Sequence, residues 1–137
     1  MSRFTNEKPL VYSCSGCSSV AQLANHLALR LQSEGVAEMS CIAGVGGDVP
    51  SLVKKAKSGR PILALDGCQL QCVRHSLARH GIQPTWHELL TDHGVRKQYR
   101  KPWSEAAADK IFPQLVGQLQ SDAKGGAGSP VAHGHDR

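Results

Sequence analysis

Five cysteines are the residues of this sequence with the most distinctive chemistry, and four of them form two closely spaced pairs. Cys14 and Cys17 have two residues between them, and Cys68 and Cys72 have three. Each pair follows a short apolar run and precedes an amphipathic segment, so we expect each pair where a strand gives way to a helix. Cys68 and Cys72 are four residues apart, so we expect both at the start of the helix with their sulfurs on one face. The positive potential of a helix N-terminus favours thiolate over thiol. Four thiolates are the ligand set of a closed zinc site, so the spacing predicts metal binding by these four cysteines.

The fifth cysteine, Cys41, is expected in or just after a second strand. It is either a core residue or a further thiol of the same site. Five thiols exceed the four of a closed zinc site, and this excess keeps two other hypotheses open. One is thiol redox or sulfur-transfer chemistry, with a disulfide or persulfide formed at Cys68 or Cys14. The other is an iron–sulfur cluster, which also takes four cysteines, and spacing alone does not separate iron from zinc.

Several other residues stand close to the cysteines in the sequence. Asp66 is expected to cap the following helix or to bond the loop, with a role as partner or base for the thiols as the alternative. Gly67 is expected to permit a close backbone approach. His75 lies one helical turn after Cys72 and is the best placed histidine ligand, although an exposed helix position is the simpler interpretation. The sequence has no nucleophile elbow and no Walker A phosphate loop, and it assigns no catalytic residue.

Apolar runs and helical stripes alternate along the chain. Strands are expected at 9–13, 38–43, 62–65 and 85–90, each followed by a helix, with the last helix at 102–120 and a flexible glycine turn at 44–47. This alternation predicts one three-layer α/β domain, Rossmann-like, with a mostly parallel four-stranded sheet and helices on both faces. In such sheets, sites form beyond the carboxyl ends of strands, where the strand order reverses. If the first and third strands are neighbours, their cysteine loops flank that point, and Cys41 reaches the same end if the second strand borders the first.

The length of the chain, 137 residues, indicates a single domain, which we expect to cover residues 1–121 and to be followed by a disordered Gly-rich tail at 122–137. No apolar run approaches the roughly 20 residues of a membrane span, and the N-terminus has no apolar signal region. We therefore expect a cytoplasmic protein without membrane contact. Cysteines in a reducing compartment are not expected to form structural disulfides.

The net charge of +5 is modest, and one dense basic cluster stands out, with Arg96, Lys97, Arg100 and Lys101 around Tyr99. No nucleic-acid-binding motif accompanies it, so no nucleic-acid partner is expected. A solvated loop is the simplest interpretation, and contact with an anion or a partner is the alternative. The partner that the sequence predicts is a metal ion.

With these motifs in place, the sequence resembles the DGC domain family of bacterial and archaeal zinc-binding proteins, named for the tripeptide Asp66, Gly67 and Cys68. The likeness covers roughly residues 8–120 and includes the C-x-x-C loop at 14–17, the segment 39–47 around Cys41, and the segment 90–95. It implies a cysteine-rich, zinc-binding domain, carried here by Cys14, Cys17, Cys68 and Cys72. It also makes Cys41 a candidate site residue, and it implies no known reaction.

Overall fold

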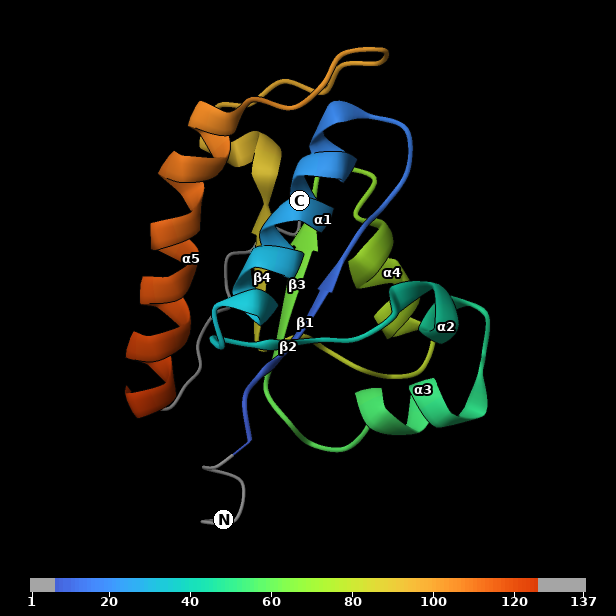
Figure 1. The fold of residues 1–137 in the computed structure, drawn as a ribbon. Helices are drawn as coiled ribbons and strands as arrows, with labels where there is room; N and C mark the ends of the chain where they lie inside the picture. Colours follow the sequence, from blue (N-terminus) through green and yellow to red (C-terminus); the bar gives the residue numbers. More distant parts are fainter. Residues whose placement is uncertain (1–6, 126–137) are drawn as a thin grey trace.

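The fold alternates strands and helices along most of its length, as the sequence predicts (Figure 1). The protein is represented by a computed structural model that describes residues 7–125. Its elements, in chain order, are β1 (Leu10–Ser13), α1 (Ser19–Ser33), β2 (Glu38–Met39), α2 (Ile42–Gly46), α3 (Pro50–Ala56), β3 (Ile62–Asp66), α4 (Cys72–Ala78), β4 (Trp86–Leu89), the 3-10 helix η2 (Leu90–His93) and α5 (Glu105–Gly125).

The four strands form one sheet in the order β2-β1-β3-β4, and every neighbouring pair is parallel. The prediction of a single α/β domain with a mostly parallel sheet is therefore confirmed. From β1 the chain moves outward to β2, whereas from β3 it moves outward to β4 on the other side. The strand order thus reverses between β1 and β3, which places the switch point of the sheet between the loops that follow these two strands.

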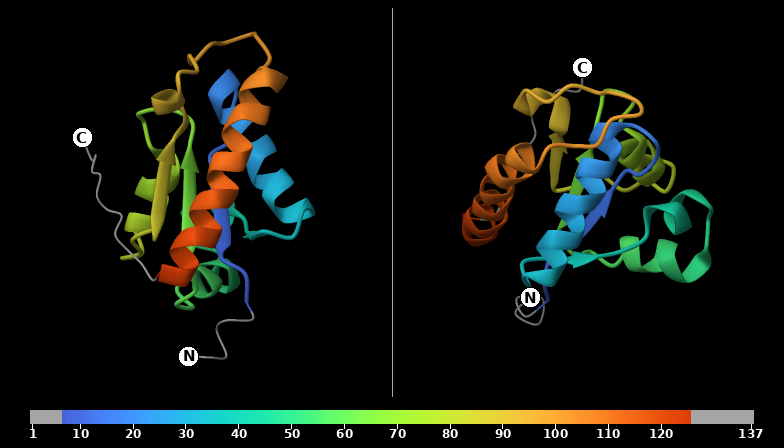
Figure 2. Two further views of the ribbon diagram at one scale, coloured as in Figure 1. Left: turned by 90° about the vertical axis from the view of Figure 1, so that its left-hand side faces the viewer. Right: turned by 45° about the horizontal axis from the view of Figure 1, so that its top comes forward.

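Helices cover both faces of the sheet. Helix α1 contacts β1, β2 and β3 and packs against α5, whereas α4 contacts β3 and α2, which in turn contacts α3. Figure 2 shows the sheet between the α1–α5 layer and the layer that contains α4. Of the helices in residues 7–125, none has the length and apolarity needed to cross a membrane.

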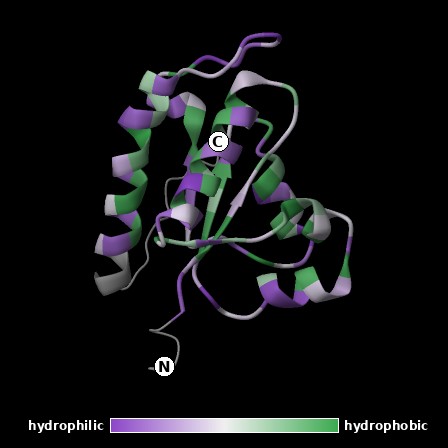
Figure 3. Ribbon diagram, in the orientation of Figure 1, coloured by the Kyte–Doolittle hydropathy of each residue, from purple (hydrophilic) through white to green (hydrophobic). Residues whose placement is uncertain are grey.

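The core is largely aliphatic. Leu23, Leu27 and Leu31 form the inward stripe of α1, and none of them is more than 1% exposed. They pack against strands whose residues are also buried, including all of β3. In Figure 3, hydrophobic colour follows β3, while hydrophilic colour marks the loop that precedes α5.

The second strand is shorter than predicted. We expected it at 38–43, but β2 ends at Met39, and Cys41 becomes the N-cap of α2. The Cys41 sulfur accepts the Gly44 backbone N–H at 3.4 Å, which turns the chain into a helix. Val45 is buried three residues after Ile42, so this helical spacing is a local signal that the strand interpretation missed. The glycine run expected as a turn is therefore mostly helical.

The last helix begins later and ends later than expected. Ser104 accepts the Ala107 N–H through its hydroxyl at 3.2 Å, so it caps the start of α5. Pro113 lies inside the helix. The helix continues to Gly125, past the boundary at 121 that we expected, and the rest of the predicted tail lies outside the described residues.

Candidate functional site

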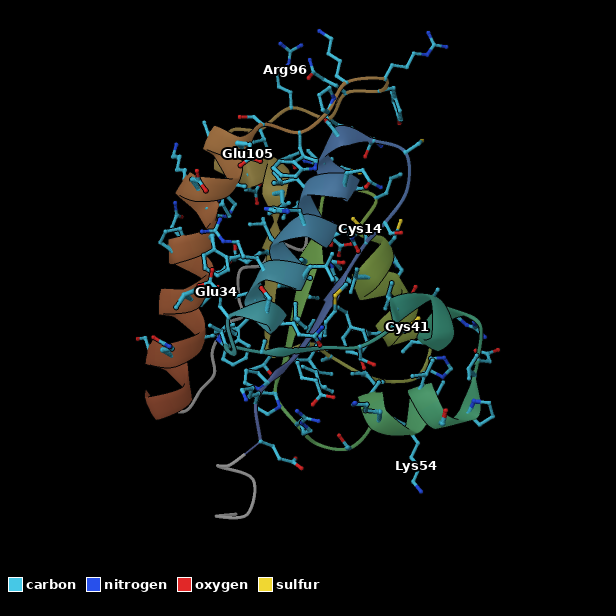
Figure 4. The ribbon with its side chains drawn as sticks, viewed as in Figure 1. Cys14, Glu34, Cys41, Lys54, Arg96 and Glu105 are labelled. Atoms are coloured by element: carbon cyan, nitrogen blue, oxygen red, sulfur yellow. The ribbon has the colours of Figure 1, made fainter. Side chains whose placement is uncertain are left out.

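All five cysteines lie near the carboxyl edge of the sheet. Cys14 follows β1, Cys41 follows β2 and Cys68 follows β3, and these three strands are parallel neighbours. Cys17 lies in the loop between β1 and α1, and Cys72 is the first residue of α4. All five are free thiols, and Figure 4 labels Cys14 beyond β1 and Cys41 at α2. The parallel sheet therefore brings together the loops that carry the five cysteines. The expectation that Cys68 and Cys72 share a helix face was wrong, because Cys68 lies before the start of α4.

Cys14 is the buried member of this group of thiols. The pKa of Cys14 is raised to about 11, chiefly by burial and also by the charges of Asp66, Cys72 and Cys68, while a hydrogen bond from Gly67 opposes the rise. That bond runs from the Gly67 N–H to the Cys14 sulfur, with the nitrogen and sulfur 3.2 Å apart. Cys14 is therefore a neutral thiol at neutral pH. Three of the others, Cys17, Cys41 and Cys72, are exposed, and Cys68 is half-buried.

Gly67 holds the two cysteine loops together. A Cβ at this position would lie 2.7 Å from the carbonyl carbon and oxygen of Val20, which belong to the backbone of α1. Only a residue without a side chain permits this approach, as the sequence predicts. The loop after β3 is therefore pressed directly against the first turn of the helix that follows the Cys14–Cys17 loop.

Asp66 anchors the helix that begins with Cys72. Its side chain is fully buried, and its carboxylate accepts the backbone N–H groups of Val73 at 2.8 Å and Arg74 at 3.2 Å. The N-cap residue itself, Gln71, has a left-handed backbone (φ 54°) and makes no capping bond through its side chain. Asp66 supplies that function from the end of β3, so the capping prediction is confirmed.

His87 completes this anchor and was missed by the sequence interpretation. Its Nε2 lies 2.8 Å from an Asp66 carboxylate oxygen. His87 pairs in register with Ala64, which shares a strand face with Asp66, so β4 brings the imidazole to the carboxylate. A usable signal did exist, because an acidic residue that ends a fully apolar strand requires a buried partner. His75, the histidine that the spacing favoured, is exposed.

The basic cluster lies over the same edge. We call residues 96–101 the basic loop. The Ser19 N–H donates to the Gln98 carbonyl at 2.7 Å, and the Gln98 N–H donates to the Ser19 hydroxyl at 3.0 Å, which fixes the loop to the start of α1. The Lys97 ammonium is hydrogen-bonded to Tyr99 and to the Cys68 thiol, and both contacts raise the pKa of Lys97. A cation therefore sits beside one of the candidate thiols.

The cysteine thiols have the chemistry that zinc requires, but the described side chains are not arranged around one metal position. Thiolates are preferred zinc ligands, and Cys68 and Cys72 lie close enough to Cys14 for their charges to raise its pKa. Within the described residues, however, no group of three or more His, Cys, Asp or Glu side chains is placed to hold a metal ion. Metal binding at this edge therefore requires that thiol side chains turn toward one another and that Cys14 release its proton.

Comparison with known proteins gives two matches. The model of a family described as the DGC domain matches residues 10–115. The Anaerobic and virulence modulator AnvM of Pseudomonas aeruginosa is 62% identical over 116 residues, which are 85% of this chain and 88% of that protein. No solved structure matches the chain.

Proposed function

This chain belongs to the DGC domain family, and from that premise we propose that it binds a metal ion, zinc in the first instance, through its clustered thiols. The observation that carries the proposal is the delivery of all five cysteines to one edge by three adjacent parallel strands. We assign Cys14, Cys17, Cys68 and Cys72 as the ligands, with Cys41 as a neighbouring thiol. The bound ion would keep these sulfurs in the thiolate form.

Residues around the thiols support this assignment. The Gly67 N–H already points at the Cys14 sulfur, and a hydrogen bond of this kind stabilises the charge of a sulfur that ionises. The buried Asp66 carboxylate fixes the start of α4 and with it Cys72. A cation at this edge would also relieve the repulsion that the other thiols and Asp66 impose on a charged Cys14.

The test is zinc uptake by protein purified without a histidine tag and without oxygen. We expect about one zinc per chain, with four thiols protected from alkylation. Cys68→Ser and Cys72→Ser should lose the metal together with part of the protein's stability, whereas Cys41→Ser, the matched control, should keep it. Unchanged zinc content in Cys68→Ser would contradict the assignment. If the protein instead contains iron and absorbs visible light, the bound group is an iron–sulfur cluster and not zinc.

A second candidate function is thiol redox or sulfur transfer, and a specific contact favours it. Tyr99 and Cys68 raise the pKa of Lys97, which therefore carries its positive charge near a thiol, and the thiolate is the form of a cysteine that attacks disulfides. The relative AnvM is named as an anaerobic and virulence modulator, which is compatible with a regulatory thiol. This candidate predicts metal-free protein that forms a disulfide or persulfide at Cys68, detected by mass spectrometry of the native chain. It fails if Cys68 alkylates only as fast as an ordinary exposed cysteine.

A further inference from the structure

The basic loop carries positive charge that its surroundings do not neutralise. Its cations have no acidic partner among the side chains that the structure describes, and they belong to Arg96, Lys97, Arg100 and Lys101. Three of them are exposed, and Lys97 is half-buried. Arginines elsewhere on the surface differ, since Arg30 lies 3.1 Å from Asp109. Arg79 likewise lies 3.0 Å from Asp48. The charge of the basic loop is therefore available to an acidic ligand.

The backbone of the basic loop is fixed on both sides. Val95 and Trp103 flank the loop, and both are partly buried against the core. The Trp103 ring stacks on His26 of α1, with the ring centres 4.2 Å apart. The Ser19 hydroxyl donates to the Arg96 carbonyl at 3.2 Å, in addition to the bonds between this serine and the loop described above. A ligand that binds the cations therefore does not have to order the loop first, which favours affinity.

The middle of the loop carries an exposed aromatic ring and a strained backbone. Tyr99 is 58% exposed, and the Lys97 ammonium lies 5.5 Å from the centre of its ring. An isolated antiparallel bridge joins Tyr99 to Ser18. The next residue, Arg100, has a φ of 65°, in the left-handed region that residues with a side chain rarely adopt. Such strain persists only where the surrounding structure imposes it, and it clusters at sites that bind ligands.

We propose that the basic loop is a docking surface for an acidic segment of a partner protein, in which carboxylates flank an apolar or aromatic side chain. Charge complementarity supports the carboxylates, because the exposed cations of the loop lack partners within the described part of the chain. Tyrosine and arginine carry much of the binding energy at protein interfaces, and the loop exposes both. This inference goes beyond metal binding and thiol chemistry and requires neither.

The surroundings of the loop favour a short protein segment over a nucleic acid. Asp92 precedes the loop and Glu105 follows it, and both side chains are exposed. Figure 4 shows Glu105 and Arg96 at the same end of the molecule. Acidic side chains on both sides would repel a phosphate backbone that continued past the loop. Surfaces for single-stranded nucleic acid also stack successive bases on several rings, whereas the basic loop has Tyr99 as its one aromatic residue.

The test measures the binding of three fluorescent peptides to the full chain, reduced and metal-free in EDTA, by fluorescence anisotropy. The first peptide has glutamates on both sides of one tryptophan, the second has glutamines in their place, and the third has alanine in place of the tryptophan. We expect the first peptide to bind about tenfold more tightly than the second and about threefold more tightly than the third. The preference over the second should disappear at about 1 M salt, which screens exposed charges.

Three variants separate charge from loop geometry, with circular dichroism to confirm that each is folded. Arg96→Gln with Lys101→Gln should weaken the first peptide about tenfold. Lys54→Gln with Lys57→Gln removes the same charge from the region of α3, at the opposite end of the molecule in Figure 4, and should leave binding unchanged. Ser19→Ala keeps every cation but removes the hydroxyl that secures the loop, so it should weaken the first peptide about threefold.

Three outcomes would overturn the inference. Equal binding of the first and second peptides, or full binding by Arg96→Gln with Lys101→Gln, would show that the cations do not select the ligand. Tighter binding of a short oligonucleotide, lost in the same double variant, would make the basic loop a nucleic-acid surface. Dimerisation of the unmodified chain that this double variant abolishes would make a second copy the occupant. The zinc content of the protein is measured separately, so each proposal can fail without the other.

Discussion

The two ends of the parallel sheet handle charge in opposite ways. At the amino end, Glu38 contacts both Lys55 and Arg60, and Arg60 also donates to the Lys8 carbonyl at 2.6 Å. Arg60 also lies 3.5 Å from Glu7, so two cations and two carboxylates neutralise one another on this surface. At the carboxyl end, the Asp66 carboxylate is fully buried and is satisfied by backbone amides and His87. The cations above it, on the basic loop, lack acidic partners within the described residues.

From this difference we infer that the amino end of the sheet stabilises the fold and that the carboxyl end carries the functional groups. Paired surface charges at the amino end hold chain segments together and leave little net charge for a ligand. The carboxyl end instead has a rigid buried anchor beneath a layer of thiols and unneutralised cations. Binding sites need this combination, because reactive groups keep their positions only if the residues below them are fixed. The comparison predicts that mutations at the two ends will differ in both size and kind.

The largest effect is expected from Asp66→Ala. The variant leaves the first amides of α4 and the half-buried His87 without their carboxylate, and breaking a buried charged network typically costs about 3–5 kcal/mol. Urea unfolding monitored by circular dichroism gives the free energy of unfolding. Alkylation of Cys72 in the folded variant should also quicken, because α4 loses its cap.

The matched substitution at the amino end is Glu38→Gln. Its carboxylate is 38% exposed, and Arg60 keeps its bonds to the Lys8 carbonyl, so the loss should stay below about 1 kcal/mol. If Asp66→Ala and Glu38→Gln lowered the free energy of unfolding equally, the two ends would not differ in their contribution to stability.

A second prediction concerns backbone packing at the carboxyl end. Gly67→Ala would place a Cβ 2.7 Å from the Val20 backbone, which cannot rotate away as a flexible side chain can. Overpacking of this kind costs about 1–3 kcal/mol and should separate the two cysteine loops. Gly117→Ala is the control, since nothing lies within 4 Å of its Cβ and it sits inside α5. That change should stabilise the protein by up to about 1 kcal/mol, and a neutral Gly67→Ala would contradict the close approach.

The sequence was sufficient to predict where the thiols gather. The runs that became β1 and β3 are short, apolar and each followed by a cysteine pair, and a parallel sheet places all carboxyl ends at one edge. The roles of Asp66 and Gly67 could also be predicted, because a helix cap and a close backbone approach are local requirements where a strand leads into a helix. These predictions depend on neighbours in the sequence.

The contacts that the sequence could not predict join residues far apart in the chain. Asp66 and His87 meet only because β4 pairs with β3 in one register, and the basic loop is joined to the start of α1 by a hydrogen bond between Gln98 and Ser19. Side-chain orientation is equally non-local: Cys14 and Cys17 belong to one motif, yet one is buried and the other exposed. The predicted position of Cys41 in a strand was wrong for a local reason. The helical spacing of the two apolar residues that follow it was interpreted as part of a strand.

The smallest expected effect is a difference in pH dependence between the ends. At the amino end, Lys55 and Arg60 lower the pKa of Glu38, so this carboxylate contributes stability above its unfolded pKa and loses it as the pH falls through the folded pKa. At the carboxyl end, a 2.9 Å hydrogen bond to Glu88 raises the pKa of His93. His93 therefore contributes its full stability below its unfolded pKa and loses it as the pH rises through the folded pKa.

Thermal unfolding of the unmodified chain, Glu38→Gln and His93→Gln over pH 3.5–9 separates the two contributions. The stability difference for Glu38→Gln should begin to shrink once the pH falls below about 4.5, the ordinary pKa of a glutamate, because the unfolded chain then takes up a proton that the folded carboxylate still resists. The difference for His93→Gln should shrink instead as the pH rises above about 7, because the imidazole then becomes neutral. The Glu38 contribution is small, since solvent screens a pair whose side chains are more than a third exposed. If both differences shrank on the same side of neutrality, one of the two ion pairs would be absent in solution, and the distinction between the ends would then depend on Asp66 alone.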